Sequence, residues 1–194
     1  MFTKKLTHKK ILASTFIAAS IGAFANLTAS FASFASLNET PTPSYSNLSS
    51  AFKIAIVRHA PGTADILDGN YNESLTSLNS ISKNSDEAFE KAMGICVANL
   101  KMGAYEIAEK ACSAAIIHIE AKGDNYNDTR YLKSIAYSNR GIVNHFIGSK
   151  ADAFADFNTA LSFDANDVVM DNLKALNIAI LKEELKSSTT AMNH

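Results

Sequence analysis

The residues best suited to chemistry are Arg58 and His59, which directly follow the apolar run Ala55-Ile-Val. An imidazole can act as a nucleophile that accepts a phosphoryl group, and a neighbouring guanidinium can neutralise the charge of the phosphate. Such a site needs a strand that ends at Arg58 and a turn that presents His59. It also needs further basic groups and a second histidine.

The stretch Ala55-Ile-Val-Arg-His-Ala60 resembles the nucleophile motif of the histidine phosphatases, which implies an α/β sandwich. That fold requires strands and helices to alternate across a region whose patterns predict helices only. The alternative is that residues 52–59 form an extended lead-in, packed on the first helices, with Arg58 and His59 in solvent. The chain supplies few downstream basic candidates: His118, Arg130, Arg140, His145 and His194.

Composition narrows the class of protein further. The chain has 194 residues, of which 47% are apolar and 19% charged, and its formal net charge is −1. This length suits one domain with a tail, and the apolar content excludes a disordered chain. Gly-rich phosphate loops, Cys-x-x-Cys pairs and His-Glu-x-x-His helices are absent from the sequence, so no cofactor or metal is expected. No nucleic-acid partner is expected either, since that needs a basic face.

The first 25 residues have the pattern of a secretory signal peptide. Four lysines precede an uncharged, mostly apolar stretch that begins at Ile11, and Ala23 and Ala25 form an A-x-A-like cleavage site. The strongly apolar part is shorter than the roughly 20 residues that a membrane-spanning helix needs. We therefore expect no stable membrane insertion after cleavage, and a retained N-terminal anchor is the alternative.

Residues 26–50 are rich in serine, threonine, asparagine and proline, which predicts a flexible linker. Without residues 1–25 the chain keeps 14 basic and 19 acidic groups, a net charge of −5. This charge further weakens a role at nucleic acids or anionic membranes. No proline follows Pro61, which suits long helices in a domain from 51 to 187. Residues 188–194 are expected to be a disordered tail.

A repeat becomes visible when the glycines are aligned. Gly103 follows Gly69 by 34 residues, and Tyr105 follows Tyr71 by the same interval. Gly148 follows Gly103 by 45 residues, and the excess of 11 matches the polar stretch 120–130, which predicts a long loop. A period of about 34 residues with two helices per period is typical of tetratricopeptide repeats.

The sequence resembles the tetratricopeptide repeat family over about residues 55–187, and most closely over residues 137–166. The resemblance implies an all-α solenoid of antiparallel helix hairpins, with glycines at the hairpin turns and Gly141 facing Ala153. Arg140, Asn144 and Ala165 depart from the family pattern, which usually has leucine, an aromatic residue and proline there. The positions expected to pack between helices are Gly62, Gly69, Gly103, Ala108, Tyr137, Gly141, Gly148, Ala153, Phe157, Ala160 and Ala175.

Hydrophobic periodicity predicts seven helices, with Ser85 and Asp167 as candidate N-caps. The last helix lacks a partner and is rich in charged residues, so we expect a polar helix that caps the stack. A helical bundle without repeats is the alternative architecture. The expected ranges are 61–68, 71–81, 85–102, 105–120, 131–147, 150–163 and 167–186.

In the tetratricopeptide family, the first helix of each pair lines a groove that binds extended peptides or partner helices. Asn139 stands where some family members hold a peptide carboxylate, but the companion lysines are missing and Gly94 replaces the preceding asparagine. A carboxylate clamp is therefore not expected, and each groove residue could equally be core. By resemblance the groove consists of Met93, Val97, Leu100, Ser138, Asn139, Ile142, His145 and Asn172.

The two cysteines, Cys96 and Cys112, fall on the facing sides of one predicted helix pair. In an exported chain they could form a disulfide, which would contribute about 3 kcal/mol in the chain-entropy model. The alternative is two buried free thiols that act as small core residues.

These patterns together predict an exported helical-repeat protein, periplasmic or secreted, that binds a protein or peptide and is not an enzyme. The groove is short, so a homodimer would extend it. A phosphatase centred on Arg58 and His59, or a purely structural part of an assembly, are the alternative functions.

Overall fold

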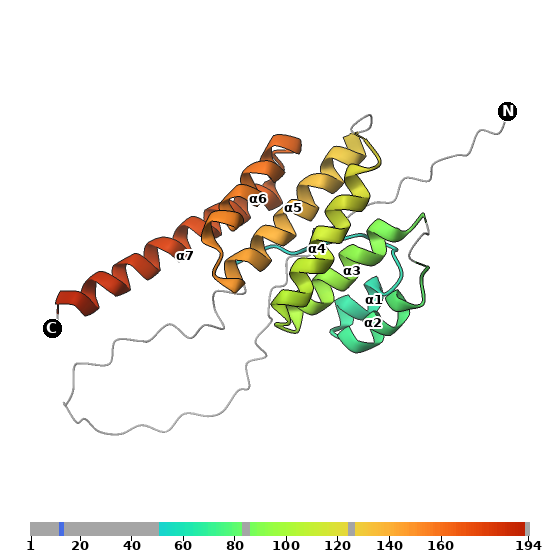
Figure 1. The fold of residues 1–194 in the computed structure, drawn as a ribbon, viewed down its shortest axis with the longest axis horizontal. Coiled ribbons are helices and arrows are strands. Elements are labelled where there is room, and N and C mark those ends of the chain that lie inside the picture. Colours follow the sequence, from blue (N-terminus) through green and yellow to red (C-terminus); the bar gives the residue numbers. More distant parts are fainter. Residues whose placement is uncertain (1–11, 14–50, 83–85, 124–126, 193–194) are drawn as a thin grey trace, which may run out of the picture.

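The computed structural model describes residues 12–13, 51–82, 86–123 and 127–192. The predicted linker, and the predicted signal peptide apart from Leu12 and Ala13, lie outside these residues. The described part forms seven helices and one pair of two-residue strands, so the predicted all-α class is confirmed (Figure 1). No helix in this part is long and apolar enough to cross a membrane.

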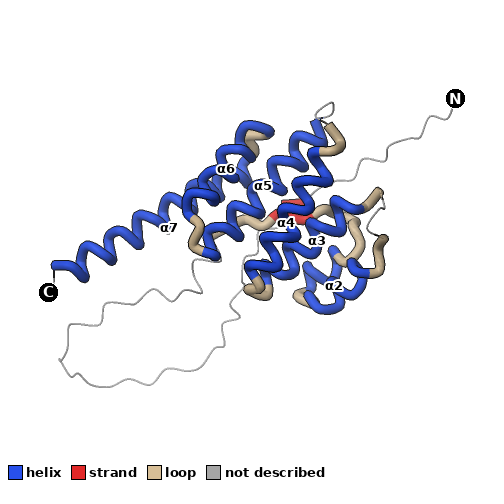
Figure 2. Tube along the Cα trace, viewed as in Figure 1, coloured by secondary structure: helices blue, strands red, loops and turns tan. Residues whose placement is uncertain are grey.

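Figure 2 shows helices joined by loops, with the strands near the middle of the molecule. Two helices have the predicted bounds, and two are longer than predicted. The long helix α5 (Asn127–Ile147) begins within the predicted loop 120–130, so that part of the loop prediction is wrong. The last helix α7 (Asp167–Met192) continues through most of the predicted tail 188–194, so that part of the tail prediction is also wrong. The elements are β1 (Leu12–Ala13), β2 (Ala55–Ile56), α1 (Thr63–Asp68), α2 (Tyr71–Asn79), α3 (Ala88–Lys101), α4 (Tyr105–Glu120), α5 (Asn127–Ile147), α6 (Lys150–Phe163) and α7 (Asp167–Met192).

The helices pack in chain order. Helix α3 lies against α4 and α5 against α6, while α4 and α5 join these pairs and α7 packs on α5 and α6 (Figure 1). Gly103 and Gly148 connect the paired helices with φ angles of 75° and 95°. Only glycine adopts such angles at little cost, so the predicted role of both residues at helix ends is confirmed.

Small residues allow close packing at two points in the core. A Cβ atom at Gly141 would lie 3.1 Å from the Phe157 ring, and one at Gly94 would lie 2.8 Å from the Leu78 side chain. The three nearest atoms that a Cβ at Gly141 would meet all belong to the Phe157 ring, and Ala153, the predicted partner of Gly141, is fully buried. Substitution of either glycine would force a buried side chain to move.

The N-caps differ from the prediction. The backbone N–H of Val169 donates to Asn166 Oδ1 over 3.1 Å, so the side chain that caps α7 belongs to Asn166 and not to Asp167. The other predicted cap, Ser85, lies outside the described residues, and Glu87 precedes α3 without a side-chain capping bond.

Candidate functional site

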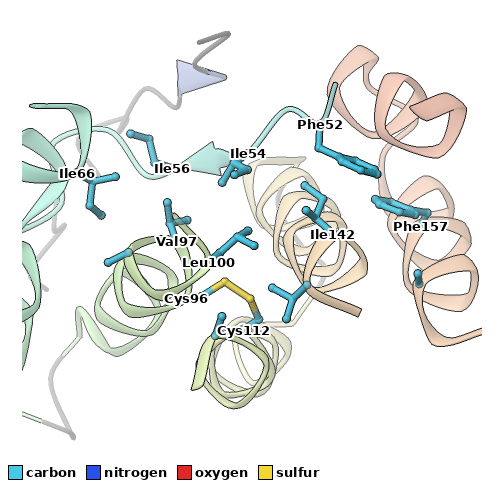
Figure 3. Packing of buried hydrophobic residues seen from close by; sticks show 14 of the residues in the cluster. Phe52, Ile54, Ile56, Ile66, Cys96, Val97, Leu100, Cys112, Ile142 and Phe157 are labelled. Atoms are coloured by element: carbon cyan, nitrogen blue, oxygen red, sulfur yellow. A yellow bond between two sulfur atoms is a disulfide. The ribbon is translucent and has the colours of Figure 1, made fainter. Parts of the chain in front are cut away.

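An extended stretch of chain, residues 51–57, crosses the first helix of each pair and contains β2; we call it the β2 segment. It contacts α3 and α5 (Figure 3). Its residues 54–57 are buried. Phe52, Ile54 and Ile56 join one hydrophobic cluster, whereas Ala55 and Val57 join another. The extended conformation and the packing on the first helices were both expected. Thr63 Oγ1 at the start of α1 donates to the Val57 carbonyl over 2.8 Å, and Ile66 shares the cluster of Ile54 and Ile56. The sequence did not predict that the segment also reaches partners 84 and 119 residues away.

Two buried asparagines hold the backbone of this segment. The Ala55 N–H donates to Asn139 Oδ1 over 3.0 Å, and Asn139 Nδ2 donates to the Ala55 carbonyl over 2.8 Å. Asn172 makes the same pair of bonds with Lys53, at 2.7 and 2.9 Å. A carboxamide thus takes the place of a neighbouring strand, and it recognises main chain without reading side chains.

The predicted groove residues are brought together, and the β2 segment lies on them. Val97, Leu100 and Ile142 share a cluster with Phe52, whereas Met93 shares the other cluster with Ala55. All the predicted groove residues are buried except His145, which is half-buried. An outside partner would reach the buried ones only by displacing the chain's own segment.

His145 lies beside the aromatic ring of Phe52, with ring centroids 5.1 Å apart. Burial lowers the pKa of His145, an effect that Glu183 opposes and Lys150 reinforces. Its Nδ1 atom is buried and has no hydrogen-bond partner. The imidazole is therefore suited to the neutral form in this position.

The surface stays open where the β2 segment starts. A cavity of about 290 Å³ lies between this start and α7. Lys53 and Asp171 form an ion pair at its rim, with 2.5 Å between Nζ and Oδ2, and this contact lowers the pKa of Asp171. Sequence reasoning placed Asn172 of α7 in the groove but missed this cavity, because it did not place residues 51–53 beside this helix. Its lining consists of Ala51, Phe52, Lys53, Asp171, Lys174, Ala175, Ile178, Ala179 and Lys182.

Arg140 and Asn144, which depart from the tetratricopeptide pattern, both bind the carboxylate of Asp156. Arg140 donates to Asp156 through Nε and Nη2, at 2.9 and 2.7 Å, and Asn144 Nδ2 donates to the same carboxylate over 2.9 Å. Arg140 also donates to Ser113 Oγ over 3.0 Å, which ties α4, α5 and α6 together. Burial raises the pKa of Asp156, and the hydrogen bonds from Arg140 and Asn144 oppose that shift.

The other candidate residues are the two cysteines and the residues of the phosphatase alternative. Cys96 and Cys112 form a disulfide with 5.0 Å between their Cα atoms, which decides between the two alternatives left by the sequence. His59 is exposed in the turn after β2 with a φ of 61°, while Arg58 is half-buried. His118 and His145 lie in α4 and α5, so the strand–helix alternation of the histidine phosphatases is not found among the described residues.

The other positions predicted to pack between helices are all at least partly buried or lie at helix ends. Ala108, Ala153, Phe157 and Ala160 are fully buried, whereas Tyr137 and Ala175 are partly buried. Gly62 and Gly69 have positive φ angles at the two ends of α1. Among the residues that the structure describes, no group of three His, Cys, Asp or Glu side chains could hold a metal ion.

No family model, no curated protein and no solved structure matches this chain.

Proposed function

We propose that this chain is an exported protein-interaction module built on tetratricopeptide-like helix pairs, and that the face carrying the β2 segment is its binding surface. The observation that carries the proposal is the use of Asn139 and Asn172 to hold extended main chain. Two carboxamides arranged in this way are suited to binding the main chain of a peptide. The module therefore acts by binding.

The open cavity beside α7 gives a partner its point of entry. Phe52 and Ile178 offer apolar surface there, while Lys174 and Lys182 add positive charge at the rim. A partner residue with an apolar body, followed by an acidic one, fits this combination. Because helices form the surface before binding, little ordering entropy opposes association.

Two features support export. The lysine-rich and then apolar start of the chain has the pattern of a signal peptide. The disulfide between Cys96 and Cys112 is compatible with an oxidising compartment such as the periplasm or the cell exterior.

Site-directed photo-crosslinking tests the proposed surface. A photoreactive amino acid at Ile178, beside the cavity, should capture a specific protein in the native cell. Ile117 on α4 is a matched control, because it is also an exposed isoleucine on a helix but does not line the cavity. Ile178→Glu should abolish recovery of that protein, and Ile117→Glu should not. Equal capture from both positions, or equal loss in both variants, contradicts the proposal.

A further inference from the structure

The β2 segment has a second edge, opposite the asparagines. In an extended chain, the N–H and C=O groups of successive residues point to alternate edges. Lys53 and Ala55 use theirs on Asn172 and Asn139. The main-chain groups of Ile54 and Ile56 therefore point away from these asparagines, toward a position where a further strand can pair.

Another strand already shows how this edge is used. Strand β1 pairs antiparallel with β2, and Leu12 lies opposite Ile56 while Ala13 lies opposite Ala55. The N–H and C=O groups of Ala55 bond Asn139, so Ala55 and Ala13 form a non-hydrogen-bonded pair. The next pair along an antiparallel ladder exchanges main-chain hydrogen bonds, and here that pair is Leu12 with Ile56. The edge thus accepts an extended stretch of uncharged residues that comes from outside the helical part.

Ile54 and Ile56 are only 8% and 3% exposed with β1 in place. A strand edge that loses its neighbour presents unpaired N–H and C=O groups, which readily pair with another chain. Leu12 and Ala13 belong to the predicted signal peptide, so an exported chain would lose them and leave this edge unpaired.

We propose that the outer edge of β2 is a strand-addition site that binds an extended, uncharged apolar segment of a partner protein in the antiparallel direction. This inference rests on the proposed function and specifies the chemistry of the partner. Main-chain pairing at Ile54 and Ile56 supplies the affinity, and the partner's alternate side chains supply the selectivity. The cavity beside α7 then receives residues that continue beyond the ladder.

The test uses the oxidised full chain with Leu12→Pro, which removes the N–H group that pairs with Ile56 and so frees the edge. The probe is a synthetic peptide with the sequence of residues 11–18, which contains Leu12 and Ala13 and carries no charged side chain. At a peptide concentration about ten times its dissociation constant, hydrogen exchange of the Ile56 amide should slow about tenfold. The same peptide methylated on the Leu12 backbone nitrogen is the matched control and should not slow it.

The full chain with Leu12→Val keeps its own β1 pairing and should bind the probe much more weakly. Equal protection by both peptides, or no protection by either, overturns the inference. Protection of Ile56 that grows with protein concentration alone would show that a second copy of the chain takes the edge, which also overturns it. The crosslinking test at Ile178 is independent of these results, so the binding surface can hold while strand addition fails.

Discussion

The side-chain amide of Asn172 in α7 donates a hydrogen bond of 2.9 Å to Ser138 Oγ in α5, 34 residues earlier in the chain. This bond fixes the orientation of the carboxamide, so that its oxygen faces the Lys53 N–H while its second hydrogen faces the Lys53 carbonyl. The separation equals the period read from the glycines. Two successive first helices are therefore linked by the same side chain that holds the β2 segment.

Asn139→Ala should destabilise the protein by about 2–4 kcal/mol, because the buried N–H and C=O groups of Ala55 lose both partners. Asn99→Ala is the matched control. Asn99 is also a buried asparagine on a first helix, but its side chain bonds only locally, to the Ile95 carbonyl. Urea unfolding measures both changes. If Asn139→Ala costs no more than Asn99→Ala, the asparagines do not hold the segment.

Reduction of the Cys96–Cys112 disulfide should lower the free energy of unfolding by about 3 kcal/mol, since the reduced chain regains the entropy of an open loop. Urea unfolding with and without a reductant measures this difference. The double variant Cys96→Ala, Cys112→Ala should give one curve under both conditions. A wild-type midpoint that does not respond to the reductant would contradict the prediction.

Arg140→Leu should cost about 3–5 kcal/mol, because it leaves the carboxylate of Asp156 buried without its cation. The double variant Arg140→Leu, Asp156→Leu removes the stranded charge, so it should be more stable than Arg140→Leu alone. Urea unfolding of the wild type, both single variants and the double variant gives the coupling free energy. Simple additivity of the two single effects would show that the pair is not coupled.

Acid should weaken the protein through His145. Its folded pKa lies below the ordinary histidine value of 6.5, so the unfolded imidazole takes up a proton before the folded one does as the pH falls. This contribution to stability is complete above about pH 6.5 and is lost as the pH falls toward the folded pKa. His145→Phe and His145→Gln should both flatten the stability profile between about pH 7 and pH 5. If both variants keep the wild-type dependence of stability on pH, a titratable group other than His145 causes the acid sensitivity.

The positions of the helices could be predicted from local sequence patterns, and the predicted bounds were most accurate where a glycine ends the preceding helix. Helices α4 and α6 have their predicted bounds because each follows Gly103 or Gly148 closely. The start of α5 was missed because the residues from Asn127 to Arg130 are polar, and polarity alone does not separate an exposed helical turn from a loop. The end of α7 was missed for the same reason.

The candidate site was only half predictable. Asn139 and Asn172 were placed in the groove by the repeat, but nothing local indicates that their ligand is the chain's own main chain. Backbone recognition leaves no mark in the sequence of the strand that is recognised. In the sequence, Arg140 and Asn144 were seen only as departures from the repeat pattern. Their common partner Asp156 lies on another helix, so the contact could be recognised only from the packing of α5 against α6.

The attachment of the β2 segment has a consequence for how the protein folds. Stacked helix pairs touch only their neighbours, so their ends can unravel separately. Here Asn139 and Asn172 join residues 84 and 119 positions apart, and these contacts close very long loops. The segment therefore ties α3 and α5 to α7, and we expect these helices to unfold together as one cooperative unit. Opening of α7 alone would break the hydrogen bonds between Asn172 and Lys53 and so disturb the middle of the domain.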